Sequence, residues 1–374
     1  MRGLTIGVVL LAGWAQVARA QPPAPPPPAD GEHARRPLDD AILASASARK
    51  LDLAPELVAR FKRAAEASPR SAPALLDYAI ALDRAASLEH AEAAYLAAAA
   101  APDFPELRFT AAARAASLAL DRGDAEATRA SVALARAALP EDAAPFVLQA
   151  QVALALRDPV AAQAAARSAL VRDPEDAGAL CVLARAHVAQ RSMGVAKLLA
   201  ARAAKAEPED AEPLLLQAEI ARAAGDPAAE LAAARAAVDA DEDSARAALA
   251  LGRALAERGL AAEALEQLSR AAELEPEAAP VRLALGAVLA AQGQKAQAEE
   301  QLLLAAKRAP GWPEPHLELA RVKELEGDAK TALAEAKVFL RLSVNAPPAG
   351  HPIHALVQRC EETLRTRAQA SVVQ

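Results

Sequence analysis

The chain has 374 residues, of which 53% are hydrophobic but only 2% aromatic, and its formal net charge at pH 7 is −7. This acidic balance argues against nucleic-acid binding, which requires a basic face, and against adhesion to anionic lipid. Most of the apolar residues are alanine and leucine, and because alanine is the strongest helix former, the composition predicts an all-α protein.

The first twenty residues have the features of a secretory signal peptide. Arg2 supplies a charged start, residues 4–17 are apolar, and Ala18-Arg19-Ala20 forms an A-x-A cleavage site. The apolar stretch is shorter than the roughly 20 residues of a membrane span. Cleavage would remove two arginines and no acid, so the net charge would change from −7 to −9. The alternative is an uncleaved membrane anchor.

Two further segments precede the regular part of the chain. Residues 21–37 are rich in proline, which is typical of a stiff linker. Residues 38–71 predict two helices, the second at about 55–67, and form a degenerate first repeat that caps the fold. A clearer helix pair begins at Ala72, and about three extra residues near Asp103 predict one loop insertion after it.

One pattern then recurs every 34 residues from Phe109 to about residue 346. Four series share this period, namely small residues in the first helix, turn residues, closing prolines and N-cap residues. The repeats begin near Ala72, Phe109, Ala143, Ala177, Ala211, Ala245, Ala279 and Pro313. The copy at Ala211 is the weakest, because Glu230 stands where a small residue is expected.

The two copies in residues 245–312 show the physical basis of the pattern. Leu251 and Leu255 lie on one stripe of a helix, and Gly252 on that stripe lets a second helix come close. Arg258-Gly259 predicts the helix end, and Pro276 prevents the second helix from continuing. A single such hairpin cannot bury its apolar face, so neighbouring hairpins must stack.

These residues fit the spacing of the motif W-x2-L-G-x2-Y…A-x3-F…P, so the sequence resembles the tetratricopeptide-repeat family. The Leu-Gly pair, the later alanine and the closing proline are present, whereas alanine, arginine or leucine replace the three aromatic residues. The resemblance implies a right-handed α-solenoid of eight helix–turn–helix repeats over residues 72–346. It also implies that peptide segments of partner proteins bind the concave groove, which the first helix of each repeat lines.

The end of the chain predicts a cap. Pro347, Pro348 and Gly350 interrupt the helices, and Pro352–Arg367 then reads as a final helix with a polar back. A solenoid needs such a segment to cover its last open face. The tail Ala368–Gln374 is expected to fray.

No arrangement of catalytic residues was found, so no enzymatic activity and no cofactor are expected. The pair His351 and His354 could hold a metal ion, but no carboxylate is placed to complete the site, and an ordinary helix start is the favoured interpretation. Cys181 and Cys360 are five repeats apart, too far for a disulfide in an open solenoid. Cys181 reads as a small apolar filler, and Cys360 as a free thiol or, less favoured, a link between two chains.

The groove positions beside the packed stripe carry leucines with interspersed arginines. The predicted partner-binding residues are Arg185, Leu215, Arg222, Leu249, Arg253, Leu283, Leu317 and Arg321. Such a row suits an extended or helical partner that carries carboxylates. Alternatively, the leucines are ordinary packing residues and the arginines a solvated face. The clamp of chaperone-type members needs asparagine, and the one asparagine of this chain, Asn345, lies outside any first helix.

Taken together, the sequence predicts an exported, periplasmic scaffold that holds partner proteins in a cell-envelope complex. It would bind no nucleic acid and would not insert into the membrane after signal cleavage. The alternative is an assembly or secretion accessory protein that its N-terminal segment anchors in the inner membrane.

Overall fold

Alanine-rich segments separated by short turns form helices throughout the computed structural model, which describes residues 55–344 and 346–373. The prediction of an all-α chain is confirmed, since all regular structure within these ranges is helical. The predicted signal peptide (1–20), the linker (21–37), the first part of the cap (38–54) and Asn345 lie outside the described residues.

The helices fall into two units, divided after Ala206. The N-terminal unit contains α4 (Pro55–Ala67), α5 (Ala72–Arg84), α6 (Leu88–Ala99), α7 (Pro105–Asp121), α8 (Ala125–Ala138), α9 (Ala144–Ala155), α10 (Pro159–Arg172), α11 (Ala177–Ala189) and α12 (Met193–Ala206). The C-terminal unit contains α13 (Ala211–Ala223), α14 (Pro227–Ala240), α15 (Ala245–Glu257), α16 (Ala261–Leu274), α17 (Ala279–Ala291), α18 (Lys295–Arg308), α19 (Glu314–Leu325), α20 (Ala329–Leu342) and α21 (Pro352–Val373).

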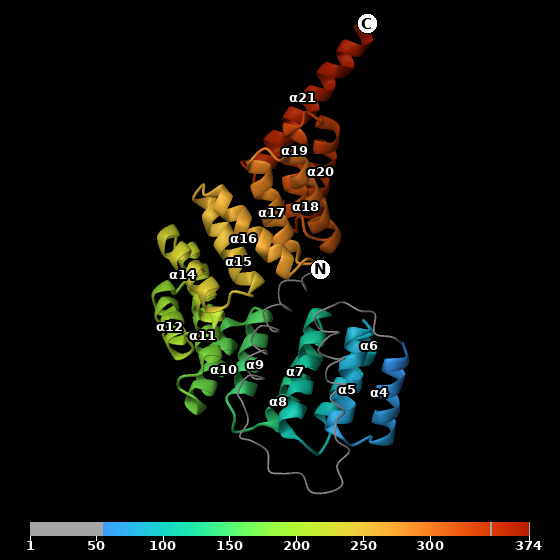
Figure 1. Ribbon diagram of the computed structural model, residues 1–374, viewed down its shortest axis with the longest axis vertical. Coiled ribbons are helices and arrows are strands. Elements are labelled where there is room, and N and C mark those ends of the chain that lie inside the picture. Colours follow the sequence, from blue (N-terminus) through green and yellow to red (C-terminus); the bar gives the residue numbers. More distant parts are fainter. Residues whose placement is uncertain (1–54, 345, 374) are drawn as a thin grey trace. The chain divides into compact units, whose positions relative to one another are not determined.

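From α5 to α20 the helices pair into hairpins of a first helix (odd-numbered) and a second helix (even-numbered). Within each unit, successive hairpins pack side by side (Figure 1). The second helix of one hairpin contacts the first helix of the next, as α14 does with α15 and α16 with α17. This arrangement buries the apolar stripe that an isolated hairpin would expose.

The turn between the two helices of a hairpin requires a left-handed backbone. Gly259 has a φ of +76°, as predicted from its place after the first helix. Arg157 and Arg191, which replace glycine at this position, have φ values of +64° and +61°. The repeat therefore imposes the turn conformation even where the residue disfavours it.

Side-chain oxygens cap the helices. The predicted caps of first helices are confirmed: Asp176 accepts a hydrogen bond from the Ala179 amide at 2.6 Å, and Ser244 accepts one from the Ala247 amide at 3.2 Å. A second series, which the sequence reading missed, caps second helices and consists of Asp124, Asp158, Asp226 and Asp328. Free amides in the first turn of both the first and the second helices are thus satisfied.

Two glycines mark the closest helix approach, as predicted. A Cβ atom on Gly286 would lie 2.7 Å from Cγ of the fully buried Leu302, and one on Gly252 would lie 2.6 Å from Cγ of Leu268. In four hairpins both helices carry alanine at this position, in the pairs Ala150/Ala166, Ala184/Ala200, Ala218/Ala234 and Ala320/Ala336, whereas the first two hairpins place Tyr95 and Val132 opposite Ala79 and Ala116. The volume lost on one helix is therefore supplied by the other, and the space is filled either way.

Two expectations from the sequence were wrong. The extra residues near Asp103 do not form a loop insertion, because α7 begins at Pro105 and gains about one turn over the other first helices. Proline is well suited to the first turn of a helix, where no amide partner is required. The final helix does not end at Arg367 but continues to Val373, since no glycine or proline follows Pro352 to stop it.

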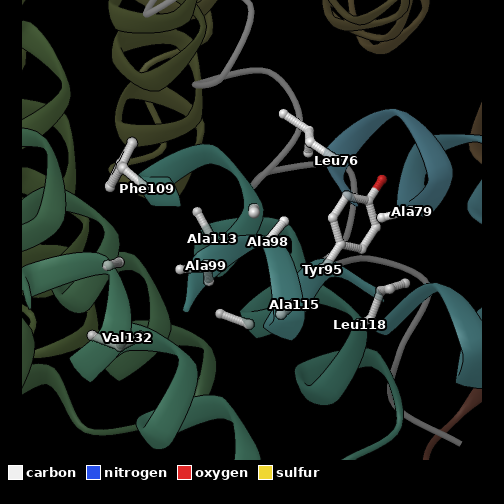
Figure 2. Packing of buried hydrophobic residues seen from close by; sticks show 14 of the residues in the cluster. Leu76, Ala79, Tyr95, Ala98, Ala99, Phe109, Ala113, Ala115, Leu118 and Val132 are labelled. Atoms are coloured by element: carbon white, nitrogen blue, oxygen red, sulfur yellow. The ribbon is translucent and has the colours of Figure 1, made fainter. Parts of the chain in front are cut away.

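The N-terminal unit has a core of alanine, leucine and a few aromatic residues from α5 to α9. Figure 2 shows this cluster, in which the Tyr95 ring lies among small apolar side chains. The Tyr95 hydroxyl donates a hydrogen bond to Asp83 at 3.1 Å, and Arg114 binds the same carboxylate with two hydrogen bonds, at 2.7 and 3.1 Å. Burial and the Asp83 charge raise the pKa of Tyr95, so its hydroxyl stays protonated and donates. One carboxylate thus links three helices.

The C-terminal unit ends with α21 packed against α19 and α20. Ile353, Leu356 and Cys360 of α21 are buried against Ala320 and Phe339. Arg359, on the exposed side, binds Glu324 with two hydrogen bonds of 2.7 and 3.0 Å. The apolar side of α21 therefore covers the last hairpin.

A double-mutant cycle should reveal the coupling between Gly286 and Leu302. Gly286→Ala should destabilise the wild-type protein, because its Cβ would clash with Leu302. Leu302→Ala should cost about 2–5 kcal/mol by opening a cavity. In the Leu302→Ala background, Gly286→Ala should be stabilising, because it restores the alanine pair of other hairpins and improves helix propensity. Urea unfolding measures all four proteins, and an equal effect of Gly286→Ala in both backgrounds would contradict the proposed packing.

Removing Asp83 should be far more costly than removing an exposed acid. Asp83→Ala leaves the partly buried Arg114 without its counter-ion and Tyr95 without its acceptor, which should cost about 3 kcal/mol. Glu175→Ala, which removes an exposed ion pair with Arg202, should cost about 0–1 kcal/mol. Thermal melts followed by circular dichroism test this, and similar losses would mean that the Asp83 network contributes no more than a surface pair.

Candidate functional site

The predicted groove residues lie on first helices, as their spacing required. Arg185 lies on α11 in the N-terminal unit and is half-buried. The other seven lie in the C-terminal unit, on α13 (Leu215, Arg222), α15 (Leu249, Arg253), α17 (Leu283) and α19 (Leu317, Arg321). We call the surface of α13, α15, α17 and α19 the first-helix face. Along it, each first helix contacts the next directly.

The leucines of this face are more enclosed than the prediction implied. Leu215 is only 5% exposed, and Leu249, Leu283 and Leu317 are half-buried. Leu249 and Leu283 pack against the core of the C-terminal unit, and Leu317 packs against the cluster that contains Phe339 and Ile353. These leucines therefore stabilise the hairpin stack and leave only part of each side chain available to a partner.

A pocket of about 150 Å³ lies between α13 and α15 and brings together four of the predicted residues. They are Leu215, Arg222, Leu249 and Arg253. Arg246 and Glu219 also line the pocket, and so does Glu230, which lies on the second helix α14. The pocket therefore combines apolar walls with three guanidinium groups and two carboxylates.

Glu230 is the functional candidate that the sequence reading noticed only as a defect of the repeat. It is 6% exposed and occupies the place of Ala162, Ala196, Ala264, Ala298 and Ala332, all fully buried in the other hairpins. One turn further along α14, Ala234 replaces the leucine found as Leu268 and Leu302. Ala166, Ala200 and Ala336 occupy the same position in other hairpins, so what distinguishes this hairpin is the buried carboxylate of Glu230.

The charges around the pocket are unequally compensated. Arg246 binds Glu212 at 2.6 Å, whereas Arg222 Nε lies 3.9 Å from Glu230 Oε1, a long ion pair. Arg253 forms no side-chain hydrogen bond or ion pair with any residue of the described ranges. Burial, and to a lesser extent the charge of Glu257, raise the pKa of Glu230, although Arg222 and Arg253 oppose the change. Burial and the charge of Arg222 lower the pKa of Arg253.

The remaining predicted arginine of the C-terminal unit is placed differently. Arg321 is exposed to solvent, as Arg222 and Arg253 are, but it binds Glu318 of its own helix at 2.7 Å. It occupies the same position of the repeat as Arg253 but does not line the pocket. The two arginines therefore form a natural pair for comparison.

His351, His354, Cys181 and Cys360, which the sequence raised as candidates for a metal site or a crosslink, make contacts within the fold. The His351 ring stacks on Phe339 with a centroid distance of 5.7 Å and accepts a hydrogen bond from the Ile353 amide. His354 Nε2 lies 3.3 Å from the Pro347 carbonyl oxygen. Cys181 and Cys360 are both buried free thiols, and burial raises the pKa of Cys360. A buried thiol is poorly placed to link two chains.

Within residues 55–344 and 346–373, no group of three or more His, Cys, Asp or Glu side chains is arranged to hold a metal ion. In the same part of the chain, no helix combines the length and the apolar character that a membrane span needs.

Comparison with known proteins identifies the fold. No family model and no curated protein matches the chain. The Cut9–Hcn1 hetero-tetramer of APC/C is similar, with 14% identity, a TM-score of 0.59, and coverage of 85% of this chain and 62% of that chain. Yeast Tom70 is similar with 14% identity and a TM-score of 0.57, over 80% of this chain and 66% of its own. This chain therefore spans less than two thirds of either structure.

A more distant likeness, with a TM-score of 0.47 and 14% identity, is to a tetratricopeptide repeat protein from Parabacteroides merdae, over 68% of this chain and 98% of that one. The 34-residue hairpins, their close-approach glycines and the two stronger likenesses agree with one another. The chain has the fold of a tetratricopeptide-repeat solenoid, built from stacked helical hairpins.

Proposed function

We propose that this protein is an interaction scaffold that binds segments of partner proteins along its first helices and performs no chemistry of its own. The observation that carries this proposal is the pocket on the first-helix face, where Arg222 and Arg253 lie beside the buried Leu215 and the half-buried Leu249. Apolar walls next to guanidinium groups suit a peptide that carries both apolar and acidic side chains. The lining contains no Ser, Thr, Cys, Lys or His, so it offers no hydroxyl, thiol or amine nucleophile.

The architecture supports the same proposal. Stacked hairpins present an extended surface, which repeat proteins use to bind partners. Cut9, whose structure is similar, was crystallised in a hetero-tetramer with Hcn1. Nucleic acid is a poor candidate partner, because the chain is acidic overall.

We further propose that the scaffold works in the bacterial cell envelope, in the periplasm. The charged start, apolar stretch and A-x-A site of residues 1–20 support export. The competing possibility is that the same segment stays attached and anchors the protein in the inner membrane.

Export predicts a defined mature end. The protein purified from its native cells should begin at Gln21, because signal peptidase recognises the small residues Ala18 and Ala20 and cleaves after Ala20. N-terminal sequencing and intact mass measure this directly. If the protein retains Met1 and needs detergent for extraction, the hypothesis of a soluble periplasmic scaffold is wrong and the membrane-anchored alternative is favoured.

Charge reversal on first helices should abolish partner binding without unfolding the protein. We compare Arg185→Glu/Arg253→Glu/Arg321→Glu with a control that carries three reversals on second helices, Arg129→Glu/Arg167→Glu/Arg235→Glu. Surface ion pairs contribute only about 0–1 kcal/mol, so both triple variants should keep the helical spectrum and nearly the same melting temperature.

The readout is crosslinking and affinity purification from the native envelope. The wild type and the second-helix triple should recover the same proteins, and the first-helix triple should lose them. Equal recovery by both triples would contradict binding along the first helices and would direct attention to the second-helix face or the termini.

A further inference from the structure

We infer that the pocket between α13 and α15 is a subsite for one acidic side chain, glutamate or aspartate, of the bound partner segment. Its carboxylate would bind Arg253 and Arg222, and its aliphatic stem would lie against Leu215 and Leu249. The inference rests on the proposed function, because it names the side chain that this part of the first-helix face recognises.

The choice of an anion follows from the pairing of charges around the pocket. Glu212 is matched by Arg246 at 2.6 Å, and Glu230 by Arg222 at 3.9 Å. Glu219 also lines the pocket, but it is not among the charges that shift the pKa of Arg253. Arg253 is left without an ion pair to the described residues, although its planar guanidinium can hold a carboxylate by two hydrogen bonds. A carboxylate placed between Arg253 and the loosely paired Arg222 would compensate both.

When no ligand occupies the pocket, the surroundings of Arg253 disfavour the protonated, charged form of its guanidinium. Burial and the repulsion from Arg222 outweigh the attraction of Glu257 and Glu230, so the pKa of Arg253 is lowered. Arg253 is nevertheless accessible from solvent, so an incoming anion can reach its guanidinium and offset the repulsion from Arg222. A basic side chain of a partner in the pocket would add to the repulsion between Arg253 and Arg222.

The fold also supplies Glu230 to the pocket, a buried carboxylate in a position that most other hairpins fill with alanine and that α8 fills with Thr128. Within the described chain its one ion pair is the long contact with Arg222, and its side chain lines the pocket. Glu230 competes with an acidic guest for Arg222. Replacing it with the neutral, equally large glutamine should therefore strengthen acid binding.

The experiment measures peptide binding to the full chain by fluorescence anisotropy. The probes are fluorescein-labelled nonapeptide pools with amidated C-termini, in which the central residue is fixed as Glu, Asp, Gln or Lys. The other positions are an equal mixture of Ala, Leu, Ser and Thr. The wild type should bind the Glu or the Asp pool about tenfold more tightly than the Gln pool, as expected for a charge-assisted hydrogen-bonded pair.

Three variants distinguish the pocket from the rest of the face. Arg253→Gln should remove the preference for acid. Arg321→Gln, at the same repeat position but paired with Glu318 outside the pocket, should keep it. Glu230→Gln should increase affinity for the acidic pools severalfold without changing the affinity for the Gln pool. Circular dichroism confirms that each variant is folded.

Several results would overturn the inference. These are equal binding of acidic and Gln pools, a preference for Lys, an acid preference that survives Arg253→Gln, or no binding of any pool. A preference seen only with free C-termini would assign the pocket to a chain end rather than a side chain. If one of these results is found while the first-helix triple variant still loses its partners, only the acidic subsite is rejected. Equal recovery of partners by both triples rejects the proposed function itself.

Discussion

The close approach of the two helices within each hairpin is the constraint on which the structure depends. Gly286 faces the fully buried Leu302, and in other hairpins an alanine faces an alanine, as Ala184 faces Ala200. Each solution fills the space between the two helices of a hairpin, so the hairpins can stack without a cavity. Because aromatic residues make up only 2% of the chain, this small-residue packing replaces the larger side chains found at the motif's aromatic positions.

Most buried charged groups of the described chain have partners, although the buried polar atoms Ser117 Oγ, His187 Nδ1 and Gln267 Oε1 have no hydrogen-bond partner. Asp83 satisfies Tyr95 and Arg114 from two neighbouring helices, and aspartates at second-helix starts satisfy free backbone amides. Against this background Glu230 is unusual, because it is buried and its one ion pair is long. A buried carboxylate that stability does not require points to a function for the cavity it lines. The irregular hairpin of an otherwise regular repeat is thus where the candidate site lies.

The candidate site could be found only partly from the sequence. The period placed Leu215, Arg222, Leu249 and Arg253 on first helices, and the structure brings these four to one pocket. The sequence did not show that Leu215 would be 5% exposed, or that Arg321 would pair with Glu318 while Arg253 stays unpaired. Such differences depend on side-chain conformations of neighbouring helices, which a one-dimensional period does not encode.

The sequence by itself determined the all-α class, the hairpin period, the left-handed turns at Gly259 and Arg157, and the close approach at Gly252. These features are local, or repeat so often that each copy confirms the others. Only the tertiary structure decided that the extra residues before α7 lengthen the helix, that α21 runs to Val373, and that Glu230 enters a cavity beside three arginines. Those outcomes depend on packing between hairpins, where residues far apart in the sequence compete for the same space and the same charges.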